Sequence, residues 1–555
     1  MNLSGVLLKV LVANGVRQLF GIPGDAINAV TDAVRRQDDI QFIQVRHEEA
    51  GAFAASAQAK LTGQLSACLG TAGPGAIHLL NGLYDARLDH APVLAITGQV
   101  ETGHLGSQYH QEVNLDRLFA DVAVYSRTVV DPAQLPKVAI EACQAALAHG
   151  GVAHIALPAN LAAEPLAFDE LQQLQAPRAG RLVADPDSSR EAVALLNRAK
   201  KPVILAGIGA KDAAPALRQL AERLQAPIIR TLKAKDFIDD NDPLCIGGLG
   251  LLGGKPAVKA IEQCDLLLML GTDFPYQAFY PTDAKVIQVD THPGRIGRRH
   301  PVTLGVVADV AQVLPPWLEA LASKETGLLS PMREEKQTML AQQEADESST
   351  ETPIHPARLL TEVAKAAPDD AIFTVDTGTV TAWAARHLRL RGQQRFVLSG
   401  GLASMAFAFS GAIGAQLAYP RQKVFALCGD GAFTMLMGDF VTAVKYQLPL
   451  VVVVLNNHKL GFITLEQESA GLPDWGTDLT NPDFAALANA CGGEGISITD
   501  PDEIAPALAR ALASDGPVLL DVQTDPNALI MPPKVELSQA VSFGVAKLKE
   551  QWERW

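Results

Sequence analysis

A single aspartate stands between two glycines in the C-terminal part of the chain, and a pair of asparagines follows it after a helix-length interval. Asp430 lies between Gly429 and Gly431, and 24 residues separate Gly431 from Asn456 and Asn457. The apolar runs that end at Asp430 and at Asn457 predict two strands with a helix between them. Because ligands bind at the carboxyl ends of strands in open parallel sheets, we expect both side chains at one ligand-binding edge.

The residue types at this edge suit a divalent cation and a phosphate group. One carboxylate and one amide oxygen form a sparse ligand set, which fits Mg²⁺ because Mg²⁺ takes its remaining ligands from phosphate and water. The two glycines let the backbone approach a phosphate, and the helix that follows offers free N–H groups to an anion. The alternative is an ordinary βαβ unit with a tight turn, which a GDG tripeptide alone would favour.

The elements that must position these residues are those of an α/β protein. Short β-branched runs alternate with Ala/Leu-rich helical patterns along the chain, which is typical of parallel sheets buried on both faces. Two polar segments, 160–188 and 331–354, interrupt the alternation and are interpreted as interdomain connections, the second also being compatible with a helix. We therefore expect three open parallel-sheet α/β domains and a C-terminal helix, at residues 1–165, 189–330, 355–530 and 536–555.

Composition excludes several classes of function. The chain has 555 residues, of which 48% are hydrophobic and 19% charged, and its net charge of −15 disfavours a nucleic-acid partner. The six cysteines are scattered without a CxxC pair, so neither a disulfide framework nor a cysteine zinc site is indicated. No signal peptide is indicated and the apolar runs are too short to span a bilayer, so we expect a cytoplasmic protein.

The C-terminal segment is predicted to be a packing helix. Its apolar residues fall on one helical face: Val541, Val545, Leu548, Trp552 and Trp555. Because the other face mixes both signs of charge, packing is favoured over peripheral contact with the inner face of a membrane, which stays the alternative.

The spacing from GDG to NN resembles the motif of thiamine diphosphate-dependent enzymes. The resemblance implies that Asp430, Asn457 and the backbone carbonyl of Lys459 bind Mg²⁺. It also implies that Glu48 binds the pyrimidine ring, and Glu49 is the alternative for this role. Met405 is then the residue that supports the bent cofactor. The three domains are then pyrimidine-binding, central FAD-binding and diphosphate-binding. The thiamine diphosphate-binding residues implied by the resemblance are Gly73, Gly378, Thr379, Met405, Gly429, Asp430, Gly431, Ala432, Asn457, Leu460, Gly461, Phe462 and Ile463.

Within that family the chain most resembles the pyruvate oxidases, including the quinone-linked pyruvate dehydrogenases, over nearly its whole length. The segment "GFITLEQE" resembles the oxidase sequence after the asparagine pair, where Phe462 lines the cofactor and Glu466 reaches the substrate. Acetohydroxyacid synthases typically carry a Gln-Trp pair there. Gln111 matches an active-site glutamine, but His110 stands where the family usually has phenylalanine, which leaves the substrate preference open.

The same resemblance implies FAD in the central domain. The literal GxGxxG at 248–253 lacks an acidic residue about twenty positions on, so a nicotinamide cofactor is not expected. The FAD-binding residues implied are Gly207, Gly209, Ala210, Thr231, Leu232, Lys233, Gly248, Gly271, Thr272, Asp273, Phe274, Asp290, Asp309 and Val310.

The expected activity is oxidative decarboxylation of pyruvate to acetate or acetyl phosphate and CO₂. Electrons would pass through FAD to quinone or oxygen, with Glu48, Gln111, Phe462 and Glu466 in the active site. The family forms its sites between subunits, which implies a homodimer or homotetramer. The alternatives are a non-redox carboligase or 2-oxo acid decarboxylase, and a non-catalytic nucleotide-binding protein.

Overall fold

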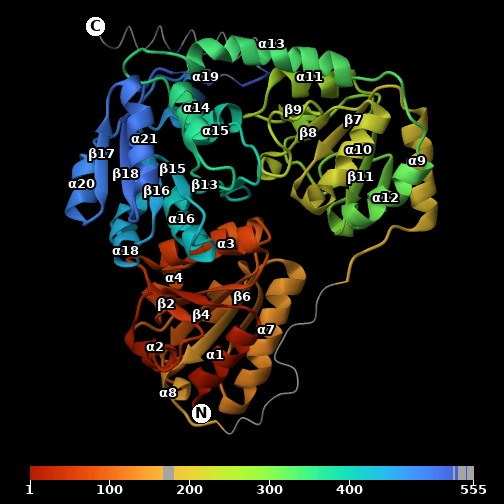
Figure 1. The fold of residues 1–555 in the computed structure, drawn as a ribbon. Coiled ribbons are helices and arrows are strands. Elements are labelled where there is room, and N and C mark those ends of the chain that lie inside the picture. Colours follow the sequence, from red (N-terminus) through yellow and green to blue (C-terminus); the bar gives the residue numbers. More distant parts are fainter. Residues whose placement is uncertain (167–179, 529, 531, 535–545, 547–555) are drawn as a thin grey trace.

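The computed structural model describes residues 1–166, 180–528, 530, 532–534 and 546, and within them three parallel six-stranded sheets, each covered by helices on its faces (Figure 1). The expected fold class, three open parallel-sheet α/β units, is therefore confirmed. The central strands are largely apolar because both faces of each sheet are covered, as in β16 (Leu450–Asn456), every residue of which is buried, whereas edge strands such as β2 (Gln41–Gln44) and β5 (Ala123–Thr128) are partly exposed. Among the described residues, no helix combines the length and the apolar character needed to cross a membrane.

The N-terminal sheet has the strand order β2-β1-β3-β4-β6-β5. Its strands are β1 (Gln18–Gly21), β2 (Gln41–Gln44), β3 (Ser66–Gly70), β4 (Val93–Gln99), β5 (Ala123–Thr128) and β6 (Val152–Pro158). The helices are α1 (Leu3–Ala13), α2 (Asn28–Arg35), α3 (Glu48–Thr62), α4 (Pro74–His78), α5 (Leu80–Leu88), α6 (Leu115–Leu118), α7 (Leu135–His149) and α8 (Ala159–Ala162).

The C-terminal sheet repeats this topology, since its order is β14-β13-β15-β16-β18-β17. Its strands are β13 (Ile372–Val375), β14 (Arg395–Leu398), β15 (Val424–Gly429), β16, β17 (Glu494–Ile498) and β18 (Val518–Gln523). The helices are α14 (Pro356–Ala366), α15 (Thr379–His387), α16 (Phe407–Ala418), α17 (Asp430–Leu436), α18 (Phe440–Lys445), α19 (Gly461–Ser469), α20 (Phe484–Ala490) and α21 (Ile504–Ala513).

The central sheet has a different order, β12-β11-β10-β7-β8-β9, in which the chain starts at the middle and builds outward in both directions. The reversal between β7 and β10 creates a switch point, the usual place for a ligand in such sheets. The strands are β7 (Pro202–Ala206), β8 (Ile228–Arg230), β9 (Cys245–Gly248), β10 (Leu266–Leu270), β11 (Lys285–Asp290) and β12 (Leu304–Val307). The helices are α9 (Pro186–Arg198), α10 (Ala214–Leu224), α11 (Lys255–Gln263) and α12 (Val310–Ala320).

The segments expected to connect the domains differ in structure. Most of 331–354 belongs to one long helix, α13 (Leu329–Glu347), which runs across the central and C-terminal sheets (Figure 1). This segment is rich in Glu, Gln, Ala and Met, which favour helix even where few apolar residues are buried. The first connection falls partly, and the predicted helix 536–555 almost entirely, outside the described residues.

The helix expected between the two strands of the opening motif is broken. Asp430 is the first residue of α17 and not the end of a strand, and a 3₁₀ turn at Met437–Asp439 separates α17 from α18. Gly438, a poor helix former, lies in that turn.

Helix α3 of the N-terminal part packs on α16 of the C-terminal part within one chain. The approach is close, because a Cβ added at Gly414 would clash with the backbone carbonyl of Ala54, and one at Gly411 would lie 3.1 Å from Ala57 Cβ. Two small residues one turn apart therefore let the helix backbones meet and fix the relative position of the two sheets.

Gly414→Ala is expected to destabilise the protein although alanine favours helix more than glycine. The added methyl group overpacks the α3–α16 contact, at a cost of about 1–3 kcal/mol. Thermal unfolding of the cofactor-free protein measures the effect. Gly438→Ala is the control, since nothing lies within 4 Å of its added Cβ; equal melting temperatures for both variants would contradict the packing argument.

Candidate active site and cofactor sites

The carboxyl edge of the C-terminal sheet gathers three helix N-termini. The neighbouring strands β13, β15 and β16 are followed by α15, α17 and α19, which begin at Thr379, Asp430 and Gly461. Helix N-termini carry partial positive charge and free N–H groups, so three of them at one edge favour an anion. A Cβ added at Gly378 or Gly429 would meet nothing within 4 Å, which leaves open space beside two of these N-termini.

Asp430 is buried at this edge, with 3% of its surface exposed. Its Oδ1 accepts the Gly431 N–H at 2.9 Å, and its Oδ2 accepts from Asn481 Nδ2 at 2.8 Å. Burial raises the pKa of Asp430, and these two hydrogen bonds oppose the rise. A bound cation would stabilise the charged carboxylate, so the site fits Mg²⁺ with a diphosphate.

Asn457 follows β16, the neighbour of β15, so Asp430 and Asn457 lie at adjacent strand ends as expected. The Asn457 side-chain oxygen accepts the Lys459 N–H at 3.1 Å. Leu460 N–H donates to the Thr477 carbonyl at 2.8 Å, which holds the 457–460 turn against the segment 477–479. Gly461 lies beside Thr379, since its Cβ would be 3.0 Å from Thr379 Cγ2.

A hydrogen-bond network behind Asp430 was not foreseen from the sequence. Asn481 donates both to Asp430 and to Asn456 Oδ1, and Asn456 donates to Asp521 Oδ1 at 2.9 Å. The first asparagine of the pair therefore braces the aspartate through Asn481, while the second faces the edge. The sequence could have drawn attention to Asp521, because it is a charged residue inside the otherwise apolar strand "VLLDVQ". No sequence feature pointed to Asn481.

Met405 lies over the GDG turn. Its Cε is 3.5 Å from the position a Cβ on Gly431 would take, and Leu460 lies next to the same point. Ala403 and Ala406, on either side, have positive φ angles of 57° and 67°, a conformation uncommon for residues other than glycine. This position is compatible with the predicted role of Met405, which is to support the bent cofactor.

Asp376 ties the Met405 segment to the sheet edge. It follows β13, is fully buried, and its Oδ1 accepts the Ala408 N–H at 2.7 Å at the start of α16. Its other oxygen has no partner within the described residues. Burial raises the pKa of Asp376 to about 7, with the Ala408 hydrogen bond opposing the rise.

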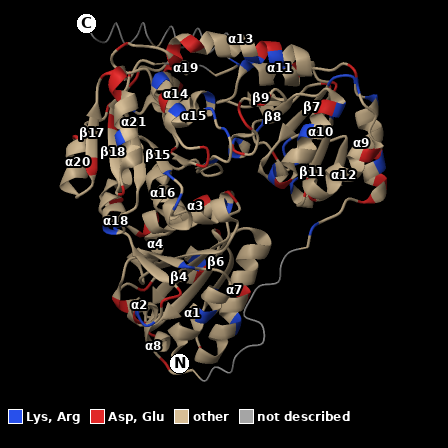
Figure 2. Ribbon diagram, in the orientation of Figure 1, with Lys and Arg blue, Asp and Glu red and all other residues tan. Residues whose placement is uncertain are grey.

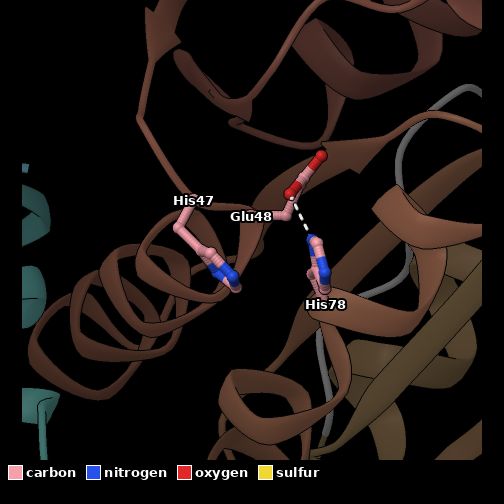
Figure 3. A group of neighbouring side chains, drawn as sticks. All are labelled: His47, Glu48 and His78. Atoms are coloured by element: carbon pink, nitrogen blue, oxygen red, sulfur yellow. Dashed lines mark hydrogen bonds and ion pairs between the residues drawn. The ribbon is translucent and has the colours of Figure 1, made fainter. Parts of the chain in front are cut away.

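Glu48 is the first residue of α3 and is 6% exposed. Its Oε2 lies 2.9 Å from His78 Nδ1, and the rings of His47 and His78 stack at 4.4 Å (Figure 3). Its Oε1 is 3.1 Å from the position a Cβ on Gly75 would take, so Glu48 faces the loop at residues 71–75, "TAGPG". Glu49 instead accepts from Asn81 at 2.6 Å, and this contact distinguishes the two glutamates.

Sequence reasoning missed His47 and His78. Together with Glu48 they offer three potential metal-ligand atoms within 4.8 Å of one another. Both imidazole side chains are more than a third exposed, at 38% and 44%, so water can satisfy their free nitrogens without an ion. We interpret His78 as the residue that orients the Glu48 carboxylate.

Gln111 lies beside the same loop. A Cβ on Gly73 would be 2.8 Å from the Gln111 carbonyl oxygen, and both residues have positive φ, 65° and 62°. Glu48, the 71–75 loop and Gln111 are therefore brought together. His110 is exposed in the adjoining turn.

The oxidase-like segment forms α19. Phe462 packs partly buried against the C-terminal core, while Ile463 and Glu466 are exposed. A small cavity of about 40 Å³ lies among Asn457, Thr379 and Phe462, and the buried Glu468, which sequence reasoning did not select, also lines it. Ala432 is buried in α17 behind the turn.

The expected FAD residues fall in several places. A cavity of about 440 Å³, in the range of small-molecule sites, lies over the central switch point and is lined by residues from the N-terminal, central and C-terminal parts of the chain. Gly209, Lys233, Gly271, Asp290 and Val310 line it. Gly207 and Thr272 pack at its glycine turns, because a Cβ at Gly207 would clash with Gly271 and Thr272, and Ala210 is buried beside them.

The remaining expected FAD residues have other contacts. Asp273 pairs with Arg298, Phe274 contacts Tyr276, and Asp309 caps α12 by accepting the Ala311 N–H at 2.8 Å. Thr231, Leu232 and Gly248 line a second cavity.

The larger cavity contains cations that are paired with carboxylates of the same lining. Lys211, Lys233 and Arg295 line it and pair with Asp236, Asp89 and Asp290, respectively. Burial, with help from Arg295 and Lys233, lowers the pKa of His90 to about 4, so this lining histidine is neutral at pH 7. Cations beside glycine turns suit a dinucleotide.

Three domain families match the sequence. They are described as thiamine pyrophosphate enzyme, N-terminal TPP binding domain at residues 1–118, central domain at 189–316, and C-terminal TPP binding domain at 376–522. A putative thiamine pyrophosphate-containing protein, YdaP, of Bacillus subtilis is 44% identical over 99% of this chain and 96% of its own. A pyruvate oxidase of Lactiplantibacillus plantarum is 36% identical over 99% and 93%. An acetolactate synthase large subunit of Parasynechococcus marenigrum is 33% identical over 94% and 87%.

Asp430→Asn is expected to weaken Mg²⁺-dependent binding of thiamine diphosphate at least about tenfold, because it removes the charge that a metal ligand supplies. Calorimetric titration of the apo protein at fixed Mg²⁺ measures the affinity. Asp515→Asn, an exposed aspartate of the same domain, is the matched control. Equal affinities for the two variants would remove Asp430 from the metal site.

Asp376 is expected to make stability fall as pH rises. Its pKa in the folded protein, about 7, lies above the ordinary 3.8, so its contribution is complete at low pH and is lost as pH rises through 7. Asp376→Asn, which cannot ionise, should therefore gain melting temperature relative to the wild type between pH 5 and pH 8. If the difference in melting temperature between the wild type and the variant does not change with pH, this assignment is wrong.

Proposed function

Because this chain belongs to the thiamine pyrophosphate enzyme family, we propose that it oxidatively decarboxylates pyruvate to acetate or acetyl phosphate and CO₂, using thiamine diphosphate, Mg²⁺ and FAD. Electrons would pass to quinone or oxygen. The observation that carries the oxidase proposal is α19, which begins at the cofactor edge and carries Phe462 and Glu466 one turn apart on one face. The 36% identity to a pyruvate oxidase agrees with it.

The residues of the C-terminal edge would hold the first cofactor. Asp430, Asn457 and the carbonyl of Lys459 would bind Mg²⁺, and the N-termini of α15, α17 and α19 would receive the diphosphate. Thiamine diphosphate, once bound, supplies the carbanion stabilisation that decarboxylation of a 2-oxo acid requires.

Glu48 would hold a proton at the pyrimidine ring, in the orientation that His78 gives it. Gln111, beside the 71–75 loop, and Glu466, on α19, would contact the substrate. Met405 would support the cofactor from its place over Gly431.

The 440 Å³ cavity would hold FAD, which supplies the two-electron step. Lys233 and Arg295 would face its phosphates, and Asp290 would accept from a ribose hydroxyl.

A homodimer or homotetramer would complete the active site. Glu48 and Asp430 come from different sheets, and no hydrogen bond or ion pair joins them in the part of the chain that the structure describes. We propose that the first domain of one subunit faces the third domain of another.

The second candidate is a non-redox carboligase, supported by 33% identity to an acetolactate synthase over 94% of the chain. In that case the flavin would not change its oxidation state during turnover. The redox state of bound FAD therefore separates the two candidates.

Anaerobic mixing of the reconstituted protein with pyruvate is expected to bleach the absorbance of bound flavin. Unchanged flavin with pyruvate consumed and acetolactate formed would select the carboligase. Unchanged flavin with pyruvate left intact would exclude pyruvate as the substrate.

Glu48→Gln should slow the bleaching on the order of 10²–10⁴-fold, since it removes a group that carries a proton. Glu49→Gln is the matched control, because Glu49 is bound to Asn81 and is expected to keep most of the rate. If Glu49→Gln slows the bleaching and Glu48→Gln does not, Glu49 and not Glu48 has the proposed role.

A further inference from the structure

Asp439 is a buried carboxylate that none of the steps proposed above uses. It ends the 3₁₀ turn that follows α17, the helix that begins at Asp430, and 1% of its surface is exposed. A buried carboxylate is costly unless its oxygens accept hydrogen bonds. The donors that Asp439 contacts therefore indicate its role.

Asp439 joins the C-terminal part of the chain to the N-terminal part. Its Oδ1 accepts the backbone N–H of Arg46 at 2.8 Å and the hydroxyl of Thr442, on α18, at 2.8 Å. Burial raises the pKa of Asp439, and hydrogen bonds from the backbone of Arg46 and His47 are among the effects that oppose the rise. Asp439 therefore holds the backbone directly before Glu48.

The backbone held in this way is the start of α3. His47 is the N-cap of the helix, and its Nδ1 accepts the Glu49 N–H at 3.2 Å. Glu48 follows as the first helical residue, with its Oε2 2.9 Å from His78 Nδ1. The backbone at 46–47 therefore sets where the Cα of Glu48 lies, whereas His78 contacts only the end of the Glu48 side chain.

The same part of the chain also holds β2, the strand that precedes α3. β2 is at the edge of its sheet, so the outer side of its backbone needs partners from elsewhere. The Tyr446 hydroxyl accepts the Gln44 N–H at 2.7 Å and donates to the Phe42 carbonyl at 3.1 Å. The basic end of α18 lies at this junction (Figure 2), where Lys445 Nζ donates to Gln44 Oε1 at 2.6 Å. Residues 439–446 therefore hold both β2 and the start of α3.

We propose that Asp439 is a positioning residue for Glu48, because it accepts the Arg46 N–H and so fixes the start of α3 against α17. This inference rests on the proposed function, in which Glu48 holds a proton at the cofactor. A displacement of about 1 Å at a catalytic group can slow a reaction about 10²-fold, so Asp439 affects the rate although it acts only through the backbone. The contact lies within one chain and does not depend on the assembly of subunits.

Amide hydrogen exchange tests the contact without any activity. Asp439→Ala should speed exchange of the Arg46 amide at least about tenfold in the folded protein, because it removes the acceptor. Mass spectrometry of overlapping peptides measures the rate. Asp242→Ala is the matched control, since Asp242 is also buried and accepts the Leu244 N–H at 2.9 Å, but lies in the central domain. Exchange at Arg46 that is the same in Asp439→Ala as in the control would overturn the proposal.

Steady-state turnover of pyruvate by the reconstituted protein tests the effect on the reaction. Asp439→Ala should lower kcat at least about tenfold and change KM less than about threefold, since a misplaced catalytic group affects the transition state more than binding. Asp242→Ala should keep the wild-type kcat. Asp439→Asn should recover most of the lost rate, because its amide oxygen can still accept the Arg46 N–H. If Asp439→Asn is as slow as Asp439→Ala, the charge and not the hydrogen bond matters, and the positioning role is wrong.

A double-mutant cycle with Glu48→Gln separates positioning from a general loss of stability. If Asp439 acts through Glu48, adding Asp439→Ala to Glu48→Gln should slow turnover less than about threefold further, because the group to be positioned is already gone. Independent effects would instead multiply. Effects of the two substitutions that multiply in full would therefore overturn the proposal.

If Asp439→Ala does not fold, Thr442→Val takes its place. This change removes the hydroxyl that donates to Asp439 and keeps the shape of the side chain, so the carboxylate is held by fewer donors. Exchange of the Arg46 amide should still rise about threefold, and unchanged exchange would overturn the proposal. If the wild type leaves pyruvate intact, the proposed function is wrong, while the exchange measurement still decides whether Asp439 holds the start of α3.

Discussion

The buried carboxylate of Asp430 is the interaction on which the proposed site depends. It directly follows β15, as the first residue of α17, with 3% of its surface exposed, and its position is fixed by Asn481, which also binds Asn456 at the end of β16. One amide thus locks two neighbouring strand ends together. A carboxylate held in this way cannot turn to solvent, so its charge is best stabilised by a cation at the sheet edge.

The same edge shows why a parallel sheet suits the binding of a cation together with an anionic group. Three adjacent strands end there, and each is followed by a helix whose N-terminus points to the edge. The N-terminal sheet has the same strand order and supplies Glu48 from the start of α3. Because α3 packs on α16 through Gly411 and Gly414, the placement of the glutamate and that of the Met405 segment are mechanically linked.

The central sheet differs in topology and separates two kinds of pocket. Its switch point forms the larger cavity, where glycine turns of β7 and β10 approach closely enough to exclude a side chain. The ends of β8 and β9 contribute to a second cavity, of about 270 Å³, which α13 and α15 also line. The segment 231–235 lies between them, with Lys233 on the larger cavity and Leu232 and Lys235 on the smaller one.

The sequence alone determined the α/β class, the three parallel sheets and the GDG-to-NN unit. These depend on apolar runs, glycine turns and spacing within one βαβ unit, which are local properties. Local patterns allowed a helix at 331–354 without requiring it, and α13 occupies most of that segment. They failed where Gly438 breaks a predicted helix into α17 and α18.

Only the tertiary structure decided which side chains meet. Asn481 is 51 residues from Asp430, and His78 is 30 residues from Glu48, so no spacing rule links them. The choice between Glu48 and Glu49 also needed the structure, because neighbouring residues on a helix face different surroundings. The 270 Å³ cavity collects residues from 230 to 389, and only the packing of α13 and α15 against the central sheet brings them together. Burial and pairing determine what such groups do, and both depend on contacts between distant segments that a single sequence does not encode in any local pattern.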